Sequence, residues 1–175
     1  VINSDSGFQL GEHGMWKKRV FYEQNVKVPF IVSAPGRLPA GSVVSEPAEL
    51  GDFLPTLLGM SGFSFPGDTA GHSLLPLITS EISHWRPACF SEIDHSMSMY
   101  DELRADSGRR LMVRTREWKM IYFKDSRLRD KDGALYNLMR DPGEHHNLYH
   151  KPGHKKIIGY LENLAEEWDR STSVR

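Results

Sequence analysis

The strongest periodic pattern in the chain lies near its carboxyl end. Apolar side chains recur there with helical spacing, at Ile157, Ile158, Leu161, Leu164 and Trp168. This spacing places them on one face, so it predicts an amphipathic helix that starts after Pro152 and covers about 154–170. A helix with such a face is stable only when the face packs against another element, so a partner surface is expected.

Strand patterns precede this helix. Leu111 and Val113 alternate with polar neighbours, residues 118–123 form an aromatic, β-prone run, and residues 134–138 form a third such segment. They predict a three-stranded antiparallel meander over 110–138 that the helix covers. The expected contacts join Trp118 or Tyr122 to Ile158, Leu161 and Trp168.

The amino-terminal part is organised differently. Val1 and Ile2 read as a strand, cut through at its start, that runs directly into a polar loop. Residues 28–33 and 87–93 read as further short strands. Asp52 is placed to cap a short buried helix, and residues 62–79, rich in Gly, Pro and Ser, read as an ordered loop. The apolar face of that helix holds Phe53, Leu54, Leu57 and Leu58.

The change of pattern predicts a boundary between residues 94 and 108. We expect residues 1–105 to form the end of an α/β domain and residues 106–175 to form a carboxyl-terminal subdomain of the meander plus its helix. The loop that follows the first strand, residues 5–18, is the first place to look for chemistry, because ligands bind at the carboxyl ends of parallel strands.

Charge and cysteine content narrow the function classes. The chain has 22 Lys and Arg residues against 23 Asp and Glu residues, a net charge of −1, so it lacks the basic surface that nucleic acid requires. No apolar run approaches the ~20 residues that cross a bilayer, so no membrane partner is expected. The single cysteine, Cys89, cannot form an internal disulfide and reads as a buried strand thiol. The cysteine content therefore does not distinguish an oxidising from a reducing compartment.

Two interpretations compete for residues 5–18. One is a glycine-punctuated surface loop whose charged groups are solvated. In the other, Asp5 offers a hard oxygen to a divalent cation, while His13 and Lys18 meet a charged substrate. The residues of this loop by themselves do not decide between them.

Six segments in order resemble the carboxyl-terminal half of the sulfatase family, within the alkaline-phosphatase-like superfamily. They are SDSGFQLGEHGMWKK, VPFIVSAPG, ELGDFLPTLLGMSG, GHSLLPLIT, RTREWKMIYF and ALYNLMRDPGEHHNL. The resemblance covers nearly the entire chain and implies the carboxyl-terminal part of an alkaline-phosphatase-like sulfatase fold. It implies a hydrolase of sulfate esters whose partners are a small-molecule or glycan sulfate ester and the missing amino-terminal half of the same protein.

The resemblance also implies site residues. The family places Asp followed by His or Asn on a calcium or magnesium ion, which gives Asp5 and Ser6 here; Ser6 departs from that pattern as a shorter, neutral donor. Lys18 takes the place of the lysine that contacts the sulfate, although Lys17 is an alternative. His13 lies beside the same site, where it would hydrogen-bond substrate or brace the loop.

The family's nucleophile, a formylglycine made in a Cys/Ser-x-Pro-x-Arg signature, has no counterpart here, since Cys89 has neither Pro nor Arg at those offsets. We therefore expect the formylglycine upstream and no activity from the isolated 175-residue chain. Two alternatives remain: a catalytically inactive sulfatase-like fragment or relative, and a phosphate or phosphonate ester hydrolase of the same superfamily.

Overall fold

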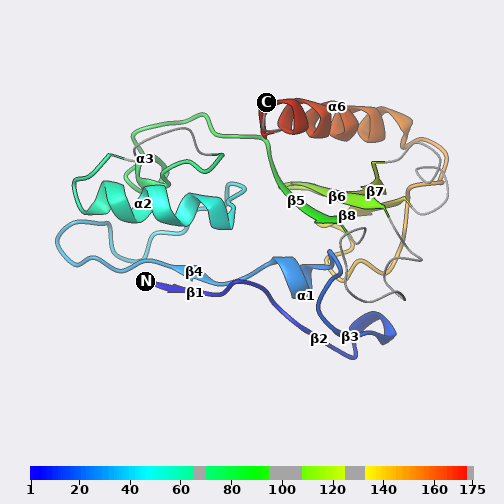
Figure 1. Cartoon of the computed structure of the whole chain (residues 1–175), viewed down its shortest axis with the longest axis horizontal. Helices are drawn as coiled ribbons and strands as arrows, with labels where there is room; N and C mark the ends of the chain where they lie inside the picture. The colour runs from blue at the N-terminus through cyan, green and yellow to red at the C-terminus, as the bar shows by residue number, and fades with distance from the viewer. Residues whose placement is uncertain (65–69, 95–107, 125–132, 173–175) are drawn as a thin grey trace.

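The computed structural model describes residues 1–64, 70–94, 108–124 and 133–172. Figure 1 shows a sheet of longer strands covered by the carboxyl-terminal helix, next to an amino-terminal part built from short strands and short helices. Within the described ranges, none of the helices combines the length and the apolar character needed to span a membrane.

The main sheet has four antiparallel strands in the order β5 (Ala88–Asp94), β6 (Arg109–Thr115), β7 (Trp118–Phe123) and β8 (Ala134–Asn137). The predicted meander over 110–138 is confirmed as β6, β7 and β8, and β5 is added at its edge by pairing along the whole of β6. The boundary predicted between residues 94 and 108 falls almost wholly outside the described residues, so it stays a prediction. β5, which precedes it, belongs to the same sheet as the strands that follow.

Helix α6 (Lys155–Thr172) lies across this sheet, as Figure 1 shows. Leu161 and Ala165 of the helix are fully buried in one cluster with Leu111 and Tyr122 of the sheet. Trp168 stacks on Phe90 of β5, with ring centroids 5.1 Å apart. The predicted helix and its packing on the meander are confirmed, and further side chains pack against the cluster: Trp118, Ile157, Ile158 and Leu164.

Replacing Leu161 with alanine is expected to lower the free energy of unfolding by about 2–5 kcal/mol, because the side chain is fully buried and a cavity would replace it. Chemical denaturation measures this loss. Glu166→Ala, an exposed position on the same helix, is the matched control and should change stability by no more than ~0.5 kcal/mol. A loss below ~1 kcal/mol for Leu161→Ala would contradict the packing described here.

The amino-terminal part contains two small sheets of two strands each. β1 (Ile2–Asn3) pairs antiparallel with β4 (Phe30–Ile31), and β2 (Gln9–Leu10) pairs antiparallel with β3 (Trp16–Lys17). The strand expected over 28–33 is thus reduced to two residues. Within the described part of the chain the partner of β1 runs antiparallel, so the expected parallel pairing of this strand stays a prediction.

The helix after Asp52 differs from its prediction. The 3-10 turn η2 (Leu50–Asp52) leads into α2 (Phe53–Met60), and the Asp52 side chain makes no capping hydrogen bond to α2. Leu54 is 49% exposed, so the expected apolar face is only partly buried. Residues 62–79, expected to be a loop, contain the short helix α3 (Leu75–Ile78). Pro76 lies in the first turn of α3, where its fixed φ angle favours the start of a helix.

Candidate functional site

The loop after β1 is shaped by its own polar side chains. The Ser4 amide donates to Asn3 Oδ1 at 2.8 Å, and the Ser4 hydroxyl donates to the Ser6 carbonyl at 2.9 Å. These local bonds are typical of Asn and Ser in turns. They leave the Asp5 carboxylate 87% exposed, with the Ser6 hydroxyl 3.4 Å from Asp5 Oδ1.

The loop is then fixed to helix α1 (Glu23–Val26) by backbone contacts. The Gly7 amide donates to the Asn25 carbonyl at 2.8 Å, and the Phe8 amide donates to the Gln24 carbonyl at 3.1 Å. A Cβ at Gly7 would overlap the Gln24 carbonyl oxygen, so only glycine allows this close approach. Asp5 and Ser6 therefore keep a fixed position relative to α1.

Lys18 follows directly on the β2–β3 hairpin, in an unusual backbone conformation. Both of its neighbours have positive φ angles, 86° at Lys17 and 79° at Arg19. Residues with a Cβ avoid this region, at a cost of about 1–2 kcal/mol each. Other contacts must hold this turn in place, and the turn directs Lys18 toward Asp5.

Asp5, Ser6 and Lys18 line one open groove of about 1300 Å³, between the amino-terminal segments and the edge of the main sheet. Lys18 Nζ lies 3.9 Å from Asp5 Oδ1, and both side chains are largely exposed, at 48% and 87%. An ion pair this exposed contributes little to stability, so both groups are available to ligands. The structure thus brings together three of the four predicted site residues.

His13 has a different environment. It lies in the 3-10 turn η1 (Glu12–Gly14), and its ring stacks on Tyr22 with centroids 3.7 Å apart and planes 5° apart. The His145 ring is 5.4 Å away, and His13 is not among the residues that line the groove. These contacts favour the bracing role over the substrate contact, and the catalytic role of His13 stays a prediction.

The cation expected at Asp5 and Ser6 would find few ligands in this chain. Calcium takes six to eight oxygen ligands, and magnesium requires an octahedral set. Asp5 supplies a carboxylate and Ser6 a hydroxyl, while the described residues contain no cluster of three or more His, Cys, Asp or Glu side chains suited to a metal. The donors present fit part of a coordination sphere, and the remaining ligands would have to come from outside the described residues.

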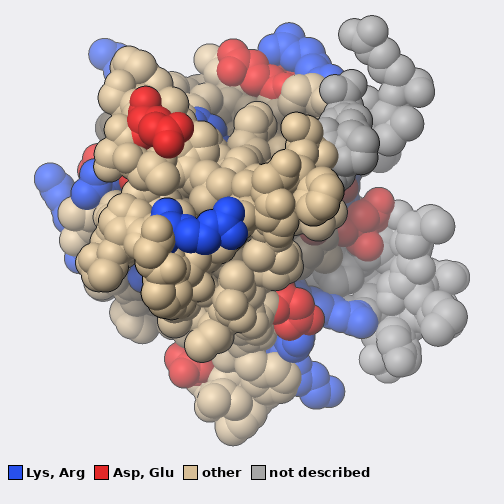
Figure 2. Space-filling view, turned by 90° about the vertical axis from the view of Figure 1, so that its left-hand side faces the viewer, with Lys and Arg blue, Asp and Glu red and all other residues tan. Residues whose placement is uncertain are grey.

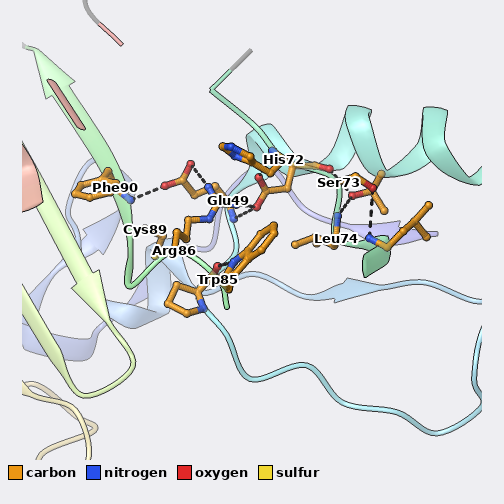
Figure 3. A network of polar contacts seen from close by, with 12 residues as sticks. Glu49, His72, Ser73, Leu74, Trp85, Arg86, Cys89 and Phe90 are labelled. Atoms are coloured by element: carbon orange, nitrogen blue, oxygen red, sulfur yellow. Dashed lines mark hydrogen bonds and ion pairs between the residues drawn. The ribbon is translucent and has the colours of Figure 1, made fainter. Parts of the chain in front are cut away.

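A second polar network joins η2, the segment that leads into α3, and β5, and its members Glu49 and Phe90 also line the groove. Glu49 accepts the Phe90 amide at 2.8 Å and pairs with Arg86 at 3.1 Å (Figure 3). Asp52, fully buried, also pairs with Arg86 and accepts the His72 amide at 2.8 Å. Burial raises the pKa of Glu49 above its ordinary value, although the Phe90 amide and Arg86 oppose the rise. Every oxygen of Asp52 is engaged, so this network is structural.

Cys89 is a buried strand thiol, as the sequence predicts. Cys89 is 8% exposed on β5, and burial raises the pKa of its thiol to about 11, which makes it a poor nucleophile. His145 and His146 are exposed in the turn after β8, where their amides donate to the Asp141 carboxylate.

A cluster of ion pairs was not predicted from the sequence. In it, Lys119 pairs with two carboxylates, those of Glu23 and Glu144. A lysine between apolar strand residues is the available signal for Lys119. Its burial depends on partners about one hundred positions before it and 25 after it, which strand periodicity does not register.

The face that carries the amino-terminal strand pair and α2 has few charged groups (Figure 2). Several apolar side chains of the amino-terminal part are exposed: Val1, Ile2, Ile31, Val43, Leu50 and Leu54.

Comparison with known proteins assigns this architecture to a family. A family model described as N-sulphoglucosamine sulphohydrolase, C-terminal, matches residues 11–170. The N-acetylglucosamine-6-O-sulfatase of Bacteroides thetaiotaomicron is 33% identical over 172 residues, which cover 95% of this chain and 29% of that protein. An arylsulfatase of Clostridium perfringens is 32% identical over 164 residues, covering 92% of this chain and 31% of that protein.

Solved structures of similar fold support the same family assignment. A protein in complex with its substrate D-glucosamine-2-N,6-O-disulfate superposes with a TM-score of 0.76 at 29% identity, over 96% of this chain and 33% of that chain. The phosphonate monoester hydrolase of Silicibacter pomeroyi superposes with a TM-score of 0.81 at 27% identity, over 98% of this chain and 34% of that chain. The chain belongs to the sulfatase family and corresponds to the carboxyl-terminal region of its members. It spans about a third of the length of the relatives it matches.

Proposed function

We propose that the full-length protein that contains this chain hydrolyses sulfate esters. The observation that supports this most strongly is the convergence of Asp5, Ser6 and Lys18 on one groove, in a chain of the sulfatase family. An exposed carboxylate 3.9 Å from an exposed ammonium can receive a cation and a sulfate side by side.

Each residue of the groove has its own role in this proposal. Lys18 binds sulfate oxygens with its ammonium group and offsets the negative charge that develops on the leaving oxygen. Asp5, assisted by Ser6, contributes oxygen ligands to calcium or magnesium. The cation supplies Lewis-acid polarisation of the sulfate group. A formylglycine upstream of this chain is expected to supply the nucleophile.

The substrate class we favour is a sulfated amino sugar or glycan. One relative is an N-acetylglucosamine-6-O-sulfatase, and one structural neighbour is a complex with D-glucosamine-2-N,6-O-disulfate. A phosphonate monoester is the second candidate, because a phosphonate monoester hydrolase superposes with a TM-score of 0.81. Both substrates present a tetrahedral anion that Lys18 could bind. Ser6, where the family has His or Asn, is the observation that favours an inactive relative.

Hydrolysis by the full-length protein tests the proposal. We expect release of sulfate from an aryl sulfate and from glucosamine-6-O-sulfate, slower hydrolysis of a phenyl phosphonate ester, and no hydrolysis by the isolated 175-residue chain. Faster turnover of the phosphonate would favour the second candidate. Absence of turnover for all three, with the upstream formylglycine present, would favour the inactive relative.

Calorimetric titration with calcium and with magnesium tests the cation site separately. Asp5→Ala in the full-length protein should weaken binding by about tenfold or more, and excess cation should partly restore turnover, because the variant removes a charged ligand. Ser6→Asn should tighten binding, since it supplies a longer carbonyl donor. Glu12→Gln, which removes a carboxylate from the same loop outside the groove, is the control. Equal affinity in all four proteins would remove Asp5 and Ser6 from the metal site.

A further inference from the structure

Lys119 is the one charged residue in the interior of the apolar strand β7, and its side chain is completely buried. Its ammonium nitrogen lies 2.7 Å from Glu23 Oε1 and 2.8 Å from Glu144 Oε1. It also donates a hydrogen bond to the Phe21 carbonyl at 2.9 Å. These three partners come from two segments far apart in the sequence, so a single side chain ties both of them to the main sheet.

The charges of this cluster balance. Arg114 of β6 contacts both Glu23 oxygens, at 3.2 and 3.1 Å, so two cations face two carboxylates. Glu144 Oε2 accepts the Glu23 amide at 2.6 Å, which adds a backbone contact to the ion pairs. Burial tends to raise the pKa of Glu23, but Arg114 and Lys119 outweigh it and hold that pKa below its ordinary value. Buried charges are tolerated only when they are paired in this way.

The cluster binds residues that lie next to the candidate site residues in the chain or in space. Phe21 lies three residues after Lys18, and Glu23 begins α1. The other end of the same helix binds the backbone of Gly7 and Phe8, directly after Asp5 and Ser6. The segment that carries Asp5 and Ser6 is thus attached to α1, and the segment that carries Lys18 leads directly into α1. Lys119 in turn attaches α1 to the main sheet.

The strained turn around Lys18 needs such an anchor. Lys17 and Arg19 have positive φ angles, and a free segment would relax out of this conformation. The hairpin fixes the chain before Lys18 through the pairing of Lys17 with Gln9. After Lys18, Phe21 is 4% exposed and its carbonyl is bound by Lys119. The turn is held from both sides.

We infer that Lys119 is a positioning residue for the groove: its buried ammonium, bound to Glu23, Glu144 and the Phe21 carbonyl, holds the turn that presents Lys18. The kinetic part of this inference rests on the proposed sulfate ester hydrolysis, whereas the structural part does not. Lys119 does not line the groove, so its effect on turnover passes through Lys18.

Variants of the full-length protein separate positioning from stability. Lys119→Met removes the ammonium, keeps most of the side-chain volume and leaves Glu144 buried without a cation. The double variant Lys119→Met/Glu144→Gln removes that unpaired charge, and the Gln oxygen can still accept the Glu23 amide. The double variant should therefore recover stability, while the Phe21 carbonyl and Glu23 still lack the ammonium. Lys155→Met, at an exposed position on α6, is the matched control.

Hydrogen exchange and steady-state kinetics are then measured on each protein. In both Lys119 variants, amides of residues 16–26 should exchange at least about tenfold faster, while those of residues 53–60 in α2 stay unchanged. With an aryl sulfate, kcat should fall about tenfold or more with a smaller change in KM, and the double variant should remain slow despite its recovered stability. Lys119→Arg should retain more turnover than Lys119→Met, and the control should match the unmodified protein.

Two results would overturn the inference. One is unchanged exchange over residues 16–26 in the double variant. The other is recovery of kcat together with stability, which would show that Lys119 acts on folding alone. If the unmodified protein hydrolyses no sulfate ester, the proposed function fails, and the exchange measurement still decides whether Lys119 holds the turn.

Discussion

Replacing Lys18 with alanine in the full-length protein is expected to lower kcat for a sulfate ester by about 10²–10³-fold at saturating cation. The ammonium lies at the groove, 3.9 Å from Asp5, and would offset charge that develops on the leaving oxygen. Because that charge is largest in the transition state, its loss should reduce kcat more than it raises KM. Steady-state kinetics with an aryl sulfate measures the effect.

Lys17→Ala is the matched control for this prediction. Lys17 is the adjacent lysine and does not line the groove, whereas Lys18 does. We expect Lys17→Ala to retain turnover within a few-fold of the unmodified protein. If instead Lys17→Ala shows the large loss and Lys18→Ala does not, the two lysines exchange roles and the site has to be rebuilt around Lys17.

Replacing Asp52 with alanine is expected to cost about 3–5 kcal/mol of folding free energy. The carboxylate is fully buried, pairs with Arg86 and accepts the amides of Glu49 and His72. Its removal leaves these donors without their acceptor and leaves the Arg86 charge with Glu49 as its remaining described carboxylate partner. Chemical denaturation, with equal m-values for the two proteins, measures the loss.

Asp52→Asn should be intermediate, because the amide keeps one acceptor oxygen and loses the charge. Glu167→Ala, an exposed acidic position on α6, should change stability by no more than ~0.5 kcal/mol. A loss for Asp52→Ala comparable to that of the control would mean that this network contributes nothing to folding.

The sequence was most informative where structure depends on neighbouring residues. Helix α6 and strands β6 and β7 follow from apolar spacing, which each segment carries by itself. The addition of β5 to the sheet was not predictable in this way, because pairing between Phe90 and Val113 joins residues separated by an undescribed segment. The role of Asp52 differs from its prediction for the same reason. Local spacing suggests a helix cap, whereas in the tertiary structure the Asp52 carboxylate pairs with Arg86 and accepts the His72 amide.

For the candidate site, too, some features were evident from the sequence and others only from the tertiary structure. The sequence by itself, through its order of segments, indicated the family and named Asp5, Ser6 and Lys18 as candidate site residues, and the structure places these three along one groove. Only the tertiary structure decided that His13 packs on Tyr22 away from that groove. It also decided that Lys119 is buried, because a lysine within an apolar strand is stable there only when carboxylates such as Glu23, distant in sequence, fold against it.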